Sequence, residues 1–147
     1  MTIHRFTATR WHNVLGTLPA ALTIASGDVV ITETIDAHGF DKDGVQRSPE
    51  PNPMNGPIFV TGAEPGDALR IEILRMTPIR ATGWTRAALA GNVVDPEFVR
   101  GLPPRDKANW RIDRQGLTVM LDPAVPGLED FVLPLEPMIG CFGVAPA

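Results

Sequence analysis

Cysteine, tyrosine and long apolar runs are scarce or missing in this chain of 147 residues. Its single cysteine, Cys141, excludes an internal disulfide framework and any CxxC zinc knuckle. No apolar run approaches the roughly 18 residues of a membrane-spanning helix, and no basic segment followed by an apolar one opens the sequence. We therefore expect a cytoplasmic protein that binds no membrane and is stabilised by packing.

A basic excess is also missing, since 13 Lys and Arg stand against 17 Asp and Glu, for a formal charge of -4. Binding to a nucleic-acid backbone usually requires the opposite balance, so nucleic acid is not an expected partner. Hydrophobic residues make up 44% and charged residues 20%, which is typical of a globular protein. The length predicts a single domain over residues 1–147.

Glycine and proline are abundant, with 14 and 15 copies spread along the chain, and they leave little room for long helices. Two segments alternate with the period of a half-buried strand, Asp28–Asp36 and Ala68–Leu74. Their spacing and that of weaker candidates predicts an all-β sandwich or barrel. The weaker candidate strands are Ile3–Thr9, Pro57–Val60, Trp110–Asp113, Leu117–Leu121, Phe131–Leu135 and Met138–Val144.

One short helix is predicted, with Asp95 as N-cap and Pro96 at the first helical position, ending near Gly101. Both clear strands begin with a Gly-Asp turn, at Gly27-Asp28 and at Gly66-Asp67. In such a turn Gly supplies an unusual φ, and Asp accepts hydrogen bonds from nearby backbone amides.

The first candidate for chemistry is the segment around Asp36 and His38. If the chain stays extended there, both side chains lie on one strand face, where they form an acid/base pair or bind one metal ion. The alternative is that Asp36 begins a turn before His38-Gly39 and that both face solvent. Asp41, Asp43 and Gly44 loosely resemble a calcium loop but lack its terminal Glu.

The second candidate is the run of tight-turn residues from Asn52 to Pro57. It predicts either a rigid connection into the next strand or a rim beside a substrate pocket, formed by Asn52, Asn55 and Gly56. Trp84 is a further candidate lining residue, although a lone Trp is more often a core residue. Cys141, flanked by Gly140 and Phe142, is expected to pack as a small hydrophobe.

The order of motifs resembles the acetamidase/formamidase family of amide hydrolases. The most specific segments are Gly62-Ala-Glu-Pro-Gly-Asp-Ala-Leu69 and Pro137-Met-Ile-Gly-Cys-Phe-Gly-Val-Ala-Pro146. Further matches are Thr34–Ala37, Gly44–Gln46, Asn52–Val60, Gly83–Thr85 and Asn92–Pro96. The resemblance runs from about Ile24 to the last residue.

This resemblance implies a jelly-roll-like β-sandwich that hydrolyses a short amide, of the formamide or acetamide type, to ammonia and a carboxylate. Family members are typically about twice as long, so the chain is expected to correspond to the N-terminal half. Asp36 and His38 are then the expected catalytic residues. Asp36 is also the expected ligand of a divalent metal, zinc or calcium.

Partners are expected on the same grounds. A half-sandwich exposes apolar surface, which predicts either a homo-oligomer or a partner chain carrying the C-terminal half. One alternative is a non-catalytic β-sandwich subunit or interaction module. The other is a ligand- or carbohydrate-binding sandwich, for which three Trp and no Tyr provide a poor aromatic platform.

Overall fold

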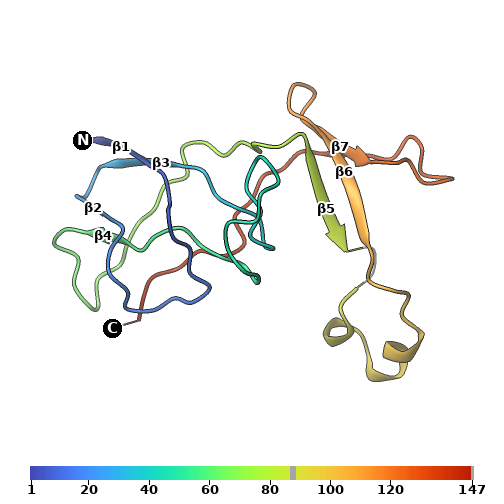
Figure 1. Cartoon of the computed structure of the whole chain (residues 1–147), viewed down its shortest axis with the longest axis horizontal. Helices are drawn as coiled ribbons and strands as arrows, with labels where there is room; N and C mark the ends of the chain where they lie inside the picture. Colours follow the sequence, from blue (N-terminus) through green and yellow to red (C-terminus); the bar gives the residue numbers. More distant parts are fainter. Residues whose placement is uncertain (87–88, 147) are drawn as a thin grey trace. The chain divides into compact units, whose positions relative to one another are not determined.

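The computed structural model describes residues 1–86 and 89–146 (Figure 1). Within them, eight short strands and two 3-10 helices are assigned, which confirms the all-β prediction. In chain order they are β1 (Ile3–Phe6), β2 (Leu22–Ile24), β3 (Val29–Thr32), β4 (Ile58–Val60), β5 (Thr82–Arg86), η1 (Gly91–Val93), η2 (Pro96–Gly101), β6 (Lys107–Asp113), β7 (Thr118–Leu121) and β8 (Val132–Pro134). The sandwich itself stays a prediction.

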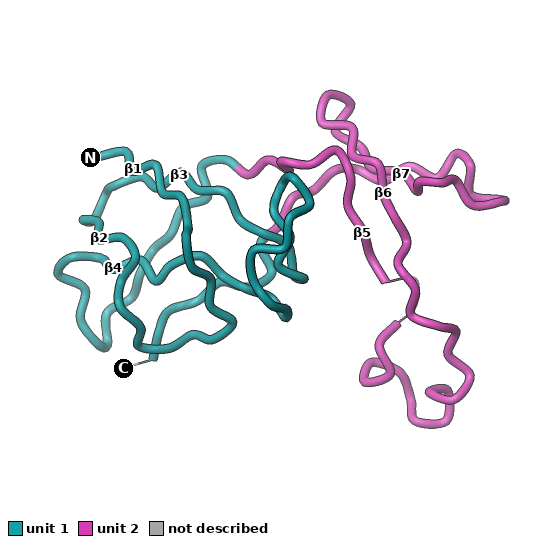
Figure 2. Tube along the Cα trace, viewed as in Figure 1, with its two compact units in different colours: residues 1–75, 139–147 teal, residues 76–138 magenta. Residues whose placement is uncertain are grey.

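The chain divides into two compact units, Met1–Arg75 with Ile139–Ala147 and Met76–Met138 (Figure 2). Unit 1 contains two small parallel pairs, β1 with β3 and β2 with β4. Unit 2 contains an antiparallel sheet in the order β5-β6-β7-β8. The single domain over residues 1–147 stays a prediction.

The first Gly-Asp turn joins the start of the chain to β3. Gly27 adopts φ +84°, and the Asp28 carboxylate accepts hydrogen bonds from the N–H groups of Ala25 at 3.1 Å and Thr2 at 2.7 Å. The ring Nε2 of His4 in β1 lies 3.0 Å from the same carboxylate. These hydrogen bonds hold the pKa of Asp28 far below its ordinary value, and the bond from His4 has the largest effect.

The second Gly-Asp turn has the same chemistry. Gly66 adopts φ +101°, and the Asp67 carboxylate accepts a hydrogen bond of 2.9 Å from the N–H of Glu64. The predicted turn role of both pairs is therefore confirmed. The strand expected after this turn is not formed, however, because Ala68–Leu74 pairs with no strand in the described part of the chain.

The sheet of unit 2 follows from the alternation in β6. Ala108, Trp110 and Ile112 are half-buried, whereas the residues between them are exposed. The ring centroids of Trp110 and Phe131 lie 6.5 Å apart. Nε1 of Trp110 donates a 2.9 Å hydrogen bond to the Thr85 hydroxyl. These contacts form the apolar face of the sheet, although no large hydrophobic side chain among residues 1–86 and 89–146 is fully buried.

Several predicted boundaries are wrong. Met138–Val144 forms no strand, and strands β2 and β5 were not predicted. The helix begins at Pro96 and ends at Gly101, as expected, but it is a 3-10 helix, and the Asp95 side chain makes no capping hydrogen bond. No helix in the described ranges is both long enough and apolar enough to span a bilayer. The cytoplasmic location stays a prediction.

Candidate functional site

The segment after β3 folds into a turn around the Asp36 carboxylate. Its Oδ1 accepts hydrogen bonds from the backbone N–H groups of His38 at 2.9 Å and Phe40 at 3.0 Å. The Asp36 backbone carbonyl accepts another from Gly39 at 2.9 Å. Since β3 ends at Thr32, the extended arrangement of Asp36 and His38 is wrong, and the alternative, a turn beginning at Asp36, is confirmed. Both residues are half-buried, so the other part of that alternative, that both face solvent, is wrong.

Gly39 fixes the shape of this turn. It is buried with φ +84°, and a Cβ added there would overlap the carbonyl oxygen of Ser48. Its own carbonyl accepts a 2.8 Å hydrogen bond from the N–H of Arg47. The close approach requires glycine, because only glycine combines this φ with the absence of a side chain.

A second carboxylate-centred turn follows at once. Oδ1 of Asp41 accepts hydrogen bonds of 2.9 Å from the N–H groups of Asp43 and Val45, and Oδ2 lies 2.6 Å from Nε of Arg47. The Arg47 guanidinium, followed by the Val45 N–H, lowers the pKa of Asp41 from its ordinary value. Asp41 therefore stabilises the loop, a role that its partial match to a calcium loop did not suggest.

The Asn52–Pro57 turn packs beside the Asp36 turn. The backbone N–H of Asn52 donates a 2.8 Å hydrogen bond to the carbonyl of Ala37, and Asn52 adopts the left-handed φ of 49°. Pro53 and Gly56 are buried, and Gly56 has φ +115°. The two predicted catalytic residues and the predicted rim therefore lie in adjoining turns of unit 1.

Asn55 ties the rim to the end of β3. Its Nδ2 donates hydrogen bonds to the Thr32 hydroxyl at 2.9 Å and to the Glu33 carbonyl at 2.7 Å. A carbonyl oxygen can only accept a hydrogen bond, so the Asn55 side-chain atom that faces the Glu33 carbonyl must be the amide nitrogen. The Oδ1 atom of Asn55 is buried and has no hydrogen-bond partner among the described residues. Buried acceptors normally have a donor, and the described residues supply none to this atom.

His38 faces a glutamate that the sequence did not single out. Its Nε2 lies 3.4 Å from Oε2 of Glu50, with the His38 side chain 20% exposed and that of Glu50 61% exposed. The Gln46 side chain donates a 3.1 Å hydrogen bond to the His38 carbonyl. Gln46 and Glu50 line a hollow of about 410 Å³, together with residues 47–49.

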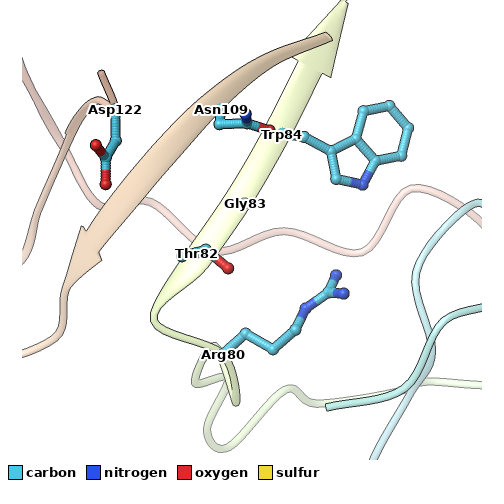
Figure 3. Close-up of a pocket in the computed structure, with 6 residues that line it drawn as sticks. All are labelled: Arg80, Thr82, Gly83, Trp84, Asn109 and Asp122. Atoms are coloured by element: carbon cyan, nitrogen blue, oxygen red, sulfur yellow. The ribbon is translucent and has the colours of Figure 1, made fainter. Parts of the chain in front are cut away.

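Trp84 lies in unit 2, on β5, where it is half-buried. It borders a hollow of about 410 Å³ whose lining is drawn in Figure 3. Figure 3 shows the Trp84 indole and the Arg80 side chain extending to one side of β5. The Trp84 ring makes cation–π contacts with two basic side chains. Lys107 Nζ lies 4.6 Å and Arg86 Cζ 5.7 Å from the ring centroid. The remaining lining residues are Thr82, Gly83, Asn109 and Asp122.

Sequence reasoning missed Arg80, Asn109 and Asp122 in this hollow. Asn109 is paired directly opposite Trp84, so the β5-β6 register brings it there. The β5 strand has no clear alternation, and without it no sequence signal links these positions. The substrate-binding role of Trp84 stays a prediction.

The residues described do not by themselves fit a metal centre. Among residues 1–86 and 89–146, no group of three or more His, Cys, Asp or Glu side chains lies close enough together to hold a metal ion. One oxygen of Asp36 already accepts two backbone N–H groups. Cys141 is exposed, so its expected packing as a small hydrophobe is wrong.

These observations define an all-β protein with polar turns gathered beyond the end of β3. The chain belongs to the acetamidase/formamidase family, whose sequence model matches residues 3–147. The match confirms the resemblance seen in the motifs, and it indicates amide hydrolysis in general. No curated protein matches the chain.

Proposed function

We propose that the chain acts in the hydrolysis of a short aliphatic amide, of the formamide or acetamide type, to ammonia and a carboxylate. The observation that carries the proposal is the family match over residues 3–147. The adjoining turns at Asp36 and Asn52 support it, because the candidate residues Asp36, His38 and Asn55 lie in these two turns of unit 1.

In this proposal, two adjacent residues bind the amide group of the substrate. Asn55 Oδ1 is a buried acceptor without a donor, and the backbone N–H of Gly56 makes no hydrogen bond to any described residue. A primary amide presents the complementary pair, an N–H donor and a carbonyl acceptor. Asn52 begins the same turn, and in this proposal its exposed side chain contacts the substrate as it enters.

Asp36 and His38 supply proton transfer. Asp36 removes a proton from a water molecule whose oxygen attacks the amide carbon. His38 in its protonated form then donates a proton to the nitrogen as the C–N bond breaks, releasing ammonia and the carboxylic acid. The proton that Asp36 took from water passes to His38, which restores both side chains, and the acid ionises to the carboxylate in water. The backbone N–H groups of His38 and Phe40 hold the Asp36 carboxylate in one orientation throughout.

A divalent metal, zinc or calcium, stays a prediction, with Asp36 as the proposed ligand. No step above is routed through it, because the described side chains do not form a metal site. The substrate-binding role of Trp84, in the other unit, also stays a prediction, and no step above depends on it.

We further propose that partner surfaces complete the protein, either a second copy or a chain that corresponds to the C-terminal half. Large hydrophobic side chains are exposed in both units, for example Ile71 at 53% and Phe98 at 62%. Where such side chains gather into one patch, the patch marks an interaction site.

The function is tested by ammonia release from formamide and acetamide, with the recombinant chain alone and mixed with a C-terminal-half chain. Turnover in either preparation supports amide hydrolysis. A compact, stable monomer that releases no ammonia in either preparation would favour the non-catalytic module. Longer and aromatic amides, assayed in parallel, test the restriction to short aliphatic substrates.

A further inference from the structure

The segment Ala68–Leu74 has the residue pattern of a strand but lacks a strand partner. Leu69, Ile71 and Ile73 alternate with Arg70 and Glu72, and every residue of the segment is exposed. The chain runs from Asp67 to Pro78 without a turn or bend, as an open trace after β4 (Figure 1). Within the described ranges, the backbone N–H and C=O groups of Ala68–Leu74 make no hydrogen bonds.

These features define an unpaired strand with one apolar face. Leu69 is 43% exposed, Ile71 53% and Ile73 55%. Unpaired backbone groups on an extended apolar segment favour the addition of a strand from another polypeptide. The backbone then gains its hydrogen bonds, and the alternating side chains decide which strand fits.

The sequence of the segment is complementary to itself. In an antiparallel pair with a two-fold axis at Ile71, Leu69 lies opposite Ile73 of the second copy, and Ile71 lies opposite Ile71. On the other face, Arg70 of each copy lies opposite Glu72 of the other copy. The pairing therefore forms two ion pairs, each between an arginine and a glutamate. A two-fold axis requires this kind of self-complementary surface.

Neighbouring registers lack this complementarity. A shift of one residue places apolar side chains opposite charged ones, because directly opposed residues share a face. Moving the axis to Arg70 or to Glu72 places two like charges opposite each other, which destabilises the pair. The pattern therefore selects the register centred on Ile71.

We propose that Ala68–Leu74 is a homodimerisation strand, which pairs antiparallel with the same segment of a second copy about a two-fold axis at Ile71. A seven-residue ladder is small beside the roughly 1,200–2,000 Å² that stable interfaces bury, so we expect a weak dimer that dissociates on dilution. The proposal does not depend on the amidase activity.

Cysteine cross-linking tests the register. In a Cys141→Ser background, Ile71→Cys places two thiols opposite each other, and mild oxidation should give a disulfide-linked dimer on a non-reducing gel. Leu69→Cys is the matched control, because it changes an apolar residue of the same face. The two-fold axis separates the two copies of this position by about four residues of strand, or roughly 13 Å, so no dimer should form.

Charge reversal tests the pairing by a second route, sedimentation of the full chain over a range of concentrations. Arg70→Glu should raise the dimer dissociation constant about tenfold, because two like-charge pairs replace two ion pairs. Adding Glu72→Arg to the same chain should restore the wild-type value. A monomer at all concentrations, equal cross-linking at positions 69 and 71, failure of the double variant, or binding only to a different chain would each overturn the proposal.

Discussion

The backbone N–H of Asn52 donates a 2.8 Å hydrogen bond to the carbonyl oxygen of Ala37. This bond joins the turn that contains the proposed catalytic residues to the turn that contains the proposed amide-binding residues. Neither turn is part of an assigned strand, so side-chain and glycine chemistry determine their geometry.

Gly39 should be the least replaceable glycine of the region. Gly39→Ala forces a Cβ against the Ser48 carbonyl at a left-handed φ, so we expect a loss of about 2–4 kcal/mol in the free energy of unfolding. Gly44→Ala is the matched control, because Gly44 also has a positive φ but nothing lies within 4 Å of an added Cβ. It should cost about 1–2 kcal/mol. Equal losses in urea denaturation would contradict the close approach at Gly39.

Asn55 should stabilise the rim through its side-chain amide. Asn55→Ala removes the bonds to the Thr32 hydroxyl and the Glu33 carbonyl, and we expect a loss of about 1–3 kcal/mol in unfolding free energy. Thr32→Val removes only the first of these acceptors and should cost less. An Asn55→Ala chain with wild-type stability in thermal and chemical unfolding would show that these bonds contribute nothing.

The Asp28 carboxylate should make stability depend on acid pH. Its pKa in the folded protein is lowered from the ordinary value of 3.8, mainly by the hydrogen bond from His4. The carboxylate therefore contributes stability above about pH 3.8, and that contribution is lost as the pH falls below this value toward the lower folded pKa. Unfolding of the wild type and of Asp28→Asn should differ most at neutral pH and converge in acid. A constant difference would rule out this linkage.

Cys141 should react readily in the folded protein, because its side chain is exposed. A chromogenic disulfide reagent should modify it in native buffer at a rate close to that in denaturant. The Cys141→Ser chain provides the blank. Strong protection in native buffer would place the thiol in a packed environment, as the flanking apolar residues had indicated.

The sequence predicted the all-β class and the Gly-Asp turns because both depend on local chemistry. It extended the strand after Asp28 as far as Asp36, whereas the structure ends β3 at Thr32. The β1-β3 pairing ends with Phe6 opposite Thr32, and the next carbonyl, that of Glu33, accepts a hydrogen bond from the Asn55 side chain instead of from a neighbouring strand.

Pairing between distant segments could not be predicted in the same way. Ala68–Leu74 has the stronger alternation but no partner in the described chain, whereas β5 has little alternation and forms a strand because it pairs with β6. The site showed the same limit. Asp36, His38 and the Asn52–Pro57 turn carried local signals, but Glu50 beside His38 and Asn109 beside Trp84 are brought there by contacts across the chain.

The most direct test of the account is the rate of ammonia release from formamide and acetamide by Asp36→Asn, in whichever preparation the wild type is active. Asparagine keeps an oxygen that accepts the His38 and Phe40 N–H groups, so the turn is retained while the charge is lost. We predict a fall in kcat of about a hundredfold or more, with an unchanged circular dichroism spectrum. Asp43→Asn, in the neighbouring exposed turn, should retain the wild-type rate. An Asp36→Asn chain with wild-type turnover would contradict the proposed mechanism.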